Sequence, residues 1–338
     1  MSQAVEIGIV LEPRGDVKQV VEQAKLAEDL GFGFVGITDG QMIWSDAFVA
    51  LTATALATKQ IRLGPWVTNP VTRHLTVIAN FICTLDALSH GRAFLGIGNG
   101  DDAVRTIGAP PATLDSLAET VDTIRALVDG ETVKRDPVNW RISTARGRAL
   151  KLYWAGANPR SLTYGARHAD GLIVSGFVDD DWLRGMLGYI AAGSQGQPRE
   201  IFFNSSVCVS EDGAAAREAV RPYVAAGLRY ASAARLSGWS KADVERMQRA
   251  YDSYHHFRDT NYEALALVPD EMIARKSISG TPQECATLME KVMSHGIRQF
   301  SLMPMGNVEA VIRMLAERVR PLLESAQRVG SYSGDVAQ

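Results

Sequence analysis

The sequence predicts an α/β fold, a (β/α)8 TIM barrel with a helical insertion covering the barrel mouth. Two observations support this fold. Short apolar runs alternate with longer segments of helical spacing, which is the pattern of a parallel sheet with crossover helices. The alternation continues along the whole chain, and 338 residues, 46% of them hydrophobic, are enough for one large core.

The expected strands are short and rich in Val, Ile, Leu and Phe. They cover residues 6–11, 34–37, 61–67, 93–98, 152–155, 172–175, 201–209 and 299–303. The expected helices carry apolar residues at three- to four-residue spacing. They cover residues 16–30, 45–58, 75–88, 281–294 and 308–326, with further helices beginning near 115, at Asn158 and Pro159, and after Glu211 and Asp212.

Two segments interrupt this alternation. Residues 130–150 are more charged and lose the apolar period, and we expect a small surface hairpin there, with 132–134 paired to 139–142. Residues 230–268 are helical in character and rich in aromatic residues, which favours an excursion over the barrel mouth. We therefore predict one domain over residues 1–330, followed by a tail at 331–338.

Composition and charge narrow the classes of function. A formal net charge of −3, with both signs evenly mixed, argues against nucleic-acid binding. No apolar run is long enough for a membrane span and the amino terminus lacks a signal pattern, so we expect a cytoplasmic protein. Cys83, Cys208 and Cys285 lack metal-ligand spacing, so we expect buried thiols and no metal.

The loops that follow the second, third and fourth strands are unusual. They cover residues 38–44, 64–74 and 96–102, and in a barrel they converge at the carboxyl ends of the strands, where barrel enzymes have their sites. Gly96, Gly98 and Gly100 do not form a dinucleotide-binding fingerprint. That fingerprint needs a further glycine at a fixed spacing and a helix that begins immediately, and neither follows here. We interpret them as glycines that let a planar ring approach the backbone.

Three ordered motifs carry a resemblance to a known family. They read GPWVTNPVTRHL at 64–75, GRAFLGIGNGD at 91–101 and LYWAGANPRSLTYGARHADGLI at 152–173. Together they resemble the bacterial-luciferase-like superfamily, and more closely its methylenetetrahydromethanopterin-reductase branch, many of whose members use coenzyme F420. The similarity extends from the first strand to the last helix.

The resemblance implies a platform for a flavin or deazaflavin ring on the third strand's loop. It implies a cis peptide at Trp66-Val67, a strained feature that only its surroundings can maintain. The alternative is a trans loop with Trp66 as a core aromatic. Arg73 and His74 are expected to fix this loop. The implied cofactor-binding residues are Asp39, Trp66, Val67, Thr68, Asn69, Gly98, Asn99 and Gly100.

The resemblance also suggests catalytic residues. Asp101 lies where family members present a carboxylate to the reacting centre, although it could instead cap a helix. Asp39 ends the second strand, and Trp44 matches an aromatic residue that walls the same pocket. Gly40 stands where the family usually has histidine, which puts dehydrogenation of the sugar-phosphate dehydrogenase type in doubt.

A phosphate of the cofactor needs backbone N–H groups near a helix start. Two segments could supply them, namely Ala155, Gly156, Ala157 and Asn158 after the fifth strand, and Ser175 and Gly176 after the sixth. In the excursion, Tyr254, His255 and His256 are candidate substrate contacts. Adjacent histidines on a helix point to different faces, so a metal site built from both is not expected.

The first functional hypothesis is hydride transfer from reduced F420 to, or from, a small organic substrate. The second is a two-component monooxygenase that uses reduced FMN and O2 on a small compound, heteroaromatic compounds among the candidates, with a separate flavin reductase as partner. A non-catalytic flavin-binding barrel is the alternative of another class. The resemblance also implies a homodimer, and apolar helix faces lie at 48–57 and 77–88.

Overall fold

The computed structural model describes residues 4–228, 240, 242, 245 and 268–325. Within them, parallel strands form a sheet in the order β3-β2-β1-β9-β7-β6-β5-β4. Bridges from Leu63 to Ala93 and from Thr68 to Ile97 join β3 to β4 and complete the circuit. The barrel strands are β1 (Glu6–Leu11), β2 (Phe34–Ile37), β3 (Arg62–Pro65), β4 (Phe94–Ile97), β5 (Lys151–Gly156), β6 (Gly171–Ser175), β7 (Glu200–Val209) and β9 (Gln299–Pro304). The predicted (β/α)8 barrel is confirmed.

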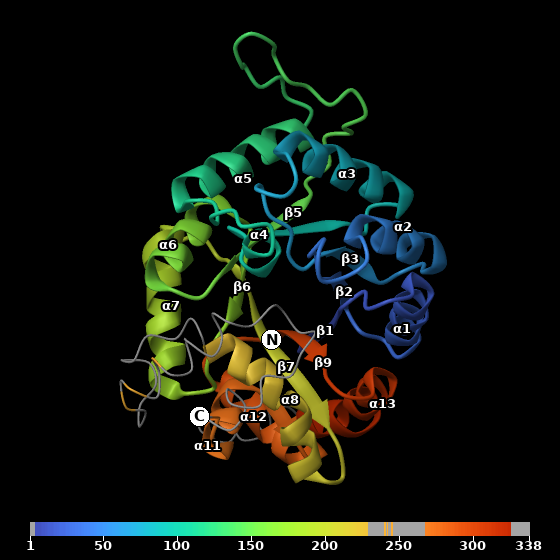
Figure 1. Cartoon of the computed structure of the whole chain (residues 1–338), viewed down its shortest axis with the longest axis vertical. Helices are drawn as coiled ribbons and strands as arrows, with labels where there is room; N and C mark the ends of the chain where they lie inside the picture. Colours follow the sequence, from blue (N-terminus) through green and yellow to red (C-terminus); the bar gives the residue numbers. More distant parts are fainter. Residues whose placement is uncertain (1–3, 229–239, 241, 243–244, 246–267, 326–338) are drawn as a thin grey trace, which may run out of the picture. The chain divides into compact units, whose positions relative to one another are not determined.

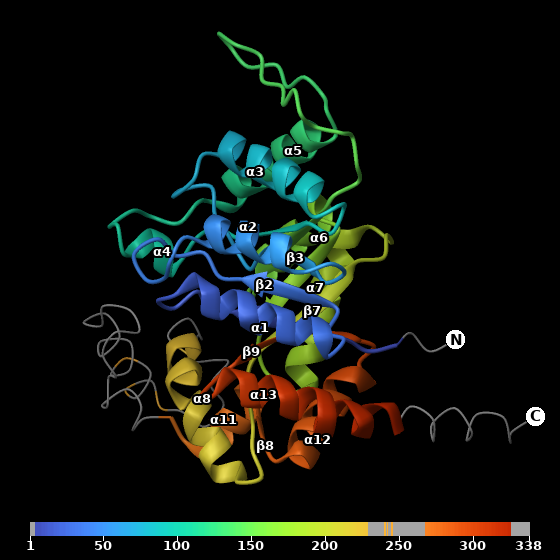
Figure 2. The same ribbon diagram turned by 90° about the vertical axis from the view of Figure 1, so that its right-hand side faces the viewer.

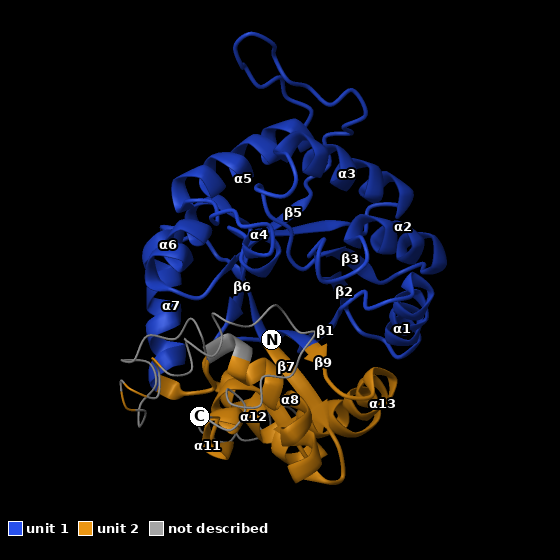
Figure 3. Cartoon of the chain, viewed as in Figure 1, with its two compact units in different colours: residues 1–176, 181–204, 297–302 blue, residues 177–180, 205–296, 303–338 orange. Residues whose placement is uncertain are grey.

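Chain contacts divide the described residues into two compact units (Figure 3). The first unit comprises residues 1–176, 181–204 and 297–302, and so includes β1 to β6 with the beginnings of β7 and β9. Its helices form an arc outside the strands (Figure 1). They are α1 (Val17–Asp29), α2 (Ala47–Ala57), α3 (Leu75–Leu88), α5 (Leu114–Val128), α6 (Pro159–His168) and α7 (Asp180–Ser194). The short helix α4 (Asp102–Arg105) lies inside this arc in the view of Figure 1.

Short polar side chains begin most of these helices. Asp16, Asp46, Thr113 and Asn158 each accept a hydrogen bond from a backbone N–H in the first turn. Such caps satisfy donors that have no partner inside the helix, and each typically contributes about 1 kcal/mol. The caps fix where each βα loop ends, and therefore how the loops meet at the barrel rim.

Aromatic side chains fill the barrel interior. Phe34 stacks on Trp66 with ring centroids 5.0 Å apart, and Phe202 meets Phe34 edge-on at 5.3 Å and Tyr153 at 4.8 Å. A Cβ on Gly8 would lie 2.2 Å from the Phe34 ring, so only glycine leaves room for that ring. The interior is thus a packed core, and space for a ligand is left at the rim.

A polar cluster lies at the amino-terminal end of the strands. Arg62 pairs with Glu6 and donates to the hydroxyl oxygen of Tyr153, which itself donates to Glu200 at 2.8 Å. Burial, followed by the neighbouring Glu200, raises the pKa of Tyr153 above its usual range. The hydroxyl of Tyr153, the buried member of this cluster, therefore has partners on both sides.

The second unit comprises residues 177–180, 205–296 and 303–338 where they are described. It contains α8 (Gly213–Leu228), α11 (Asp270–Lys276), β8 (Ile278–Gly280), α12 (Pro282–Ser294), α13 (Val308–Met314) and the π-helical turn η2 (Leu315–Val319). The strand β8, which the sequence did not predict, pairs with residues 207–209 of β7. Cys208 and Cys285 are buried here, and burial raises the pKa of Cys285 to about 12.

The two predicted insertions have different outcomes. Residues 130–150 contain the expected antiparallel pairing, reduced to one bridge between Val133 and Trp140, and extend beyond α3 and α5 (Figure 1 and Figure 2). Nearly all of the predicted excursion at 230–268 lies outside the described residues. Among the helices that are described, none has the length and apolarity needed to cross a membrane.

Candidate functional site

A pocket of about 350 Å³ opens at the carboxyl ends of the strands, within the first unit. Its wall is built from the ends of β2 to β6 and from the middle of β7. The lining residues are Thr38, Asp39, Trp44, Trp66, Val67, Thr68, Asn69, Gly98, Asn99, Gly100, Asp101, Asp102, Ala103, Ala155, Gly156, Ala157, Ile173, Ser175 and Asn204. Loops from successive βα units meet here because all strands of a parallel barrel end at the same rim.

The loop after β3 is held to its neighbours by backbone hydrogen bonds. The Trp66-Val67 peptide is cis, at the position predicted from the sequence. The N–H of Trp66 donates to the carbonyl of Ile37 at 2.7 Å, and the N–H of Thr68 donates to that of Gly96 at 3.1 Å. The N–H of Gly98 returns a bond to Thr68 at 2.9 Å. The loop is therefore an ordered extension of the sheet.

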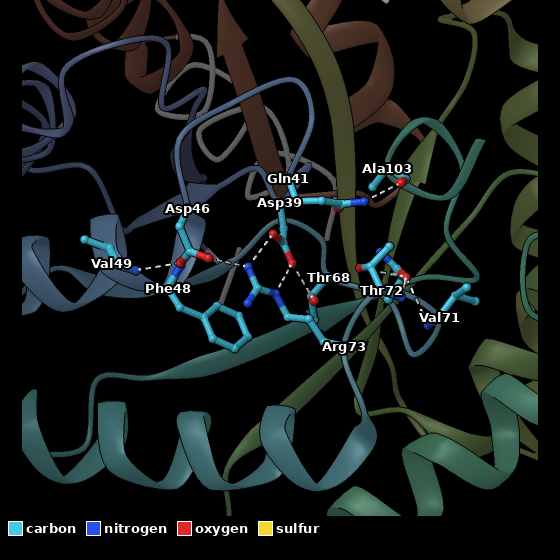
Figure 4. A network of polar contacts seen from close by, with 11 residues as sticks. Asp39, Gln41, Asp46, Phe48, Val49, Thr68, Val71, Thr72, Arg73 and Ala103 are labelled. Carbon is cyan, nitrogen blue, oxygen red and sulfur yellow. Dashed lines mark hydrogen bonds and ion pairs between the residues drawn. The ribbon is translucent and has the colours of Figure 1, made fainter. Parts of the chain in front are cut away.

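Asp39 anchors this loop from the end of β2 (Figure 4). Its side chain is only 3% exposed. One carboxylate oxygen accepts from the hydroxyl of Thr68 at 2.7 Å and from Nε of Arg73 at 3.0 Å, and the other accepts from Nη2 of Arg73 at 3.1 Å. Charge-assisted bonds of this kind are geometrically specific. Asp39 thus fixes Thr68 in the pocket wall.

Arg73 joins two loops of the rim. Besides Asp39 it binds Asp46, the capping residue of α2, at 2.9 Å, and its guanidinium lies 4.0 Å from the Phe48 ring centroid. Burial alone would lower the pKa of Arg73, but the bonds to both carboxylates raise it above the usual range. Burial likewise tends to raise the pKa of Asp46, and Arg73 together with backbone N–H groups lowers it. The prediction that Arg73 fixes the loop is confirmed.

Asp101 lies at the edge of the pocket, just before α4. Its side chain is 42% exposed and pairs with Arg105 at 2.7 Å. Gly100, which precedes it, has φ of +83°, and a Cβ there would lie 2.3 Å from Val104. Glycine is therefore needed to turn the chain at this point. The turn brings the carboxylate of Asp101 to the pocket rim.

Trp44 lines the pocket, and Gly40 packs against its ring. A Cβ on Gly40 would lie 2.8 Å from two atoms of the Trp44 ring. The indole occupies the space that a side chain at position 40 would need. The glycine at position 40, where the resemblance leads one to expect histidine, therefore leaves the space that the Trp44 ring occupies.

A further polar cluster reaches the pocket around Asn204 of β7. The side-chain oxygen of Asn204 accepts from Nε1 of Trp66 and from the hydroxyl of Ser301, each at 3.0 Å. Its side-chain nitrogen donates to the hydroxyl oxygen of Ser175 at 2.9 Å. Asn204 thus connects the buried Trp66 to a hydroxyl at the pocket surface.

The comparison with family models gives the class of this protein. Residues 4–299 match the model described as luciferase-like monooxygenase. The chain belongs to this family. The 5,10-methylenetetrahydromethanopterin reductase of Methanolobus tindarius is 28% identical to this luciferase-like chain over 334 residues, 92% of this chain and 98% of the relative. The enzyme of that name from Archaeoglobus fulgidus is 30% identical over 307 residues, 87% and 92% of the two chains.

A solved structure supports the same fold. The coenzyme F420-dependent tetrahydromethanopterin reductase from Methanopyrus kandleri matches with a TM-score of 0.81 and 24% identity, covering 95% of this chain and 100% of that one. The luciferase-like chain is an oxidoreductase, since its relatives are. Among the described residues, no group of three or more His, Cys, Asp or Glu side chains could hold a metal ion.

The structure brings most of the predicted site residues of this luciferase-like protein to one pocket. Two do not line it. The Asn158 side chain caps α6 by accepting from the N–H of Ser161, and Gly176 is covered by the ring of Trp182. The predicted substrate contacts Tyr254, His255 and His256 lie outside the described residues.

Sequence reasoning did not single out some of the pocket residues. They are Thr38, Asp102, Ala103, Ile173 and Asn204. Asn204 had a usable signal, because it begins a polar stretch, Asn204 to Ser206, that interrupts the apolar residues of a barrel strand. The others are ordinary neighbours of residues that were predicted, and their types gave no separate signal.

Proposed function

We propose that this protein binds the ring of coenzyme F420 in the rim pocket, where the reduced cofactor would reduce, or the oxidised cofactor would oxidise, a small organic substrate. The observation that carries the proposal is the convergence of the three motif segments, which end at Val67, Asp101 and Gly156, around one pocket. The names of the relatives, which are F420-dependent or pterin reductases, support the deazaflavin.

The pocket wall fits a planar ring. A Cβ on Gly98 would lie 3.3 Å from Val67 and 3.5 Å from Ala155, so glycine leaves bare backbone between two small apolar side chains. Trp44 and Ile173 add apolar surface to the same wall. Ligand sites for flat molecules commonly combine such apolar walls with a few placed polar groups. When bound, reduced F420 supplies a hydride.

The chain's own residues then have separate roles. Asp101, with an exposed carboxylate at the rim, holds or delivers the proton that accompanies hydride transfer. Asp39 keeps Thr68 in place beneath the ring. Both carboxylate oxygens of Asp39 are already bonded to Thr68 or Arg73, so we assign it a positioning role. Trp44 limits the space beside the ring. We further propose Gly156 and Ala157 as the backbone contacts of the cofactor tail.

The second candidate function is a monooxygenase that uses reduced FMN and O2. The description of the matching family model, luciferase-like monooxygenase, favours it. The same wall accommodates either ring, because both are planar tricyclic systems of similar size. In this case a separate flavin reductase must deliver the reduced cofactor, and the partner would be a second protein.

An anaerobic titration with each reduced cofactor tests the proposal. We expect saturable binding of reduced F420 and weaker binding of reduced FMN, measured by calorimetry. Gly98→Val should abolish binding by filling the wall, whereas Gly188→Ala, at a position on α7 with open space around it, should not. Tight binding of reduced FMN without affinity for reduced F420 would reverse the order of the two candidates.

We also propose a homodimer that uses helices α2 and α3. Val49 and Leu56 on α2 are 59% and 69% exposed, and Val77 on α3 is 52% exposed. Phe48 of α2 and Phe81 of α3 stack with centroids 3.6 Å apart, which joins the two helices into one surface. Large apolar side chains gathered on one face are typical of an interface between subunits.

A further inference from the structure

We propose that Asn204 is a positioning residue that makes the hydroxyl of Ser175 a fixed hydrogen-bond donor toward the ligand in the pocket. The inference rests on the proposed function, since it assigns a contact to the same cofactor. The inference goes beyond the proposed function in two ways. It names a residue of β7 that lies outside the three motifs, and it gives the direction in which the Ser175 hydroxyl donates its proton.

The orientation of the Asn204 amide follows from Trp66. An indole N–H can only donate, so the atom of Asn204 that lies 3.0 Å from Nε1 of Trp66 must be the oxygen. Ser301 donates to the same oxygen at 3.0 Å and is fully buried. Trp66 is itself buried in the aromatic core. The amide therefore cannot flip without losing a bond to a buried donor.

The orientation of Ser175 follows from Asn204. The amide nitrogen of Asn204 also can only donate, and it lies 2.9 Å from the hydroxyl oxygen of Ser175. Ser175 must accept this bond, so its own proton points elsewhere. Ser175 ends β6, is exposed and lines the pocket. Its remaining donor is therefore available to an acceptor atom inside the pocket.

The directions of these hydrogen bonds determine which kind of ligand group can pair with the Ser175 proton. The group facing Ser175 should be a hydrogen-bond acceptor, either a carbonyl oxygen of the ring or a phosphate oxygen of the tail. A group that only donates would leave the Ser175 proton without an acceptor, which is unfavourable in a partly closed pocket. The wall thus discriminates between acceptors and donors at this point.

Asn204→Asp is the sharpest test, because it changes the direction of the bond with almost no change of shape. A carboxylate still accepts from Trp66 and Ser301, but it forces Ser175 to donate to it, and the pocket loses its donor. We expect the Kd for reduced F420 at neutral pH to rise about three- to tenfold, the range for one hydrogen bond. Ser175→Ala should give a similar rise, and the double variant no further rise.

Acidification supplies a readout that a merely structural role would not move. Once the new carboxyl is protonated it can donate to Ser175 again. The Kd of Asn204→Asp should then approach the wild-type value measured at the same pH, while the Kd of Ser175→Ala stays raised. Phosphate-free ring compounds, riboflavin or the corresponding ribityl deazaflavin, identify the acceptor. An unchanged penalty with them indicates a ring oxygen, and a lost penalty indicates a phosphate.

Ser301→Ala is the matched control, because it removes one donor to the Asn204 oxygen but leaves Trp66 to fix the amide. We expect its Kd within about twofold of wild type, and melting curves should confirm that all variants fold. If wild type binds and Asn204→Asp or Ser175→Ala binds equally well, this inference is wrong and the proposed function stands. If wild type binds neither reduced cofactor, both are wrong.

Discussion

Gly40 illustrates how one missing side chain can reshape a pocket. The family resemblance leads one to expect histidine after Asp39, and a Cβ at position 40 would already lie 2.8 Å from the Trp44 ring. A histidine and this placement of Trp44 therefore exclude each other. With glycine at position 40 and the Trp44 ring lying against it, this position supplies no imidazole for proton transfer.

Gly40→Ala tests this packing. The added methyl group should displace Trp44 and lower the free energy of unfolding by about 1–3 kcal/mol, the usual cost of overpacking. Chemical denaturation measures the loss, and near-ultraviolet circular dichroism reports the indole. Gly185→Ala, at an open position on α7, is the control; it should leave the indole signal unchanged and should not lower the free energy of unfolding. An unaltered indole signal in Gly40→Ala would contradict the proposed crowding.

Asp101 is the second residue for which we predict an effect. If its carboxylate transfers a proton, Asp101→Asn should lower kcat about 100-fold or more and change KM little. Steady-state kinetics with a turned-over substrate measures this. Asp102→Asn is the comparison, because Asp102 also lines the pocket but begins α4. Equal losses in both variants would indicate a general effect of charge at the rim and not proton transfer by Asp101.

At the scale of elements, side-chain carboxylates fix loops that connect helices to strands. Glu28 near the end of α1 accepts from the N–H groups of Lys59, Gln60 and Ile61, at 2.6 to 3.1 Å, and so closes the loop between α2 and β3. Burial tends to raise the pKa of Glu28, but these three N–H groups and the nearby Arg92 lower it below the ordinary value.

This pKa shift gives a pH dependence. A carboxyl whose pKa is lower in the folded state stabilises the fold above its unfolded pKa, and the stabilisation is lost as the pH falls through the folded value. Glu28→Gln should therefore cost about 1 kcal/mol at neutral pH, a figure kept small because solvent screens the group. The difference from wild type should shrink below the ordinary pKa of glutamate.

Urea denaturation at several pH values measures this difference. The control is Glu22→Gln, since Glu22 pairs with Lys25 on the exposed face of the same helix. It should have little effect at any pH. A cost for Glu28→Gln that persists unchanged into acid would show that the charge of Glu28 is not what closes the loop.

The elements that were predictable from the sequence are those with strong periodicity. The strands at 6–11 and 34–37 and the helix at 75–88 were predicted with the bounds that the structure has, because strands buried on both faces leave continuous apolar runs. The strand β8 has three residues and leaves no such run. The helix α7 was missed because its glycines, such as Gly185 and Gly188, weaken the helical pattern.

The site was predictable only where it follows the motifs. Its glycines and the cis peptide lie at positions that sequence alone can suggest. The partners of these residues are set by tertiary contacts, which a linear pattern does not contain. The pairing of Arg73 with Asp46 spans 27 positions, and that of Trp66 with Asn204 spans 138. The assignment of residues 1–330 to one domain stays a prediction.

At the scale of the whole molecule, the proposed dimer can be separated from the fold. Leu56→Glu places a charge on the exposed apolar face of α2 and should convert the dimer to a monomer without unfolding it. Light scattering coupled to size-exclusion chromatography measures the mass. The control is Val138→Glu, at a comparably exposed apolar residue of the segment 130–150. A monomeric wild type, or a variant that stays dimeric, would contradict the proposed interface.

The two indoles in the pocket wall have a practical consequence. Trp44 and Trp66 are two of the six tryptophans in the chain, and both line the pocket. A flavin or deazaflavin absorbs light in the region where indoles emit, so its arrival beside these rings should quench their fluorescence by energy transfer. The protein thus carries a built-in optical probe, and occupancy can be followed in real time without any label.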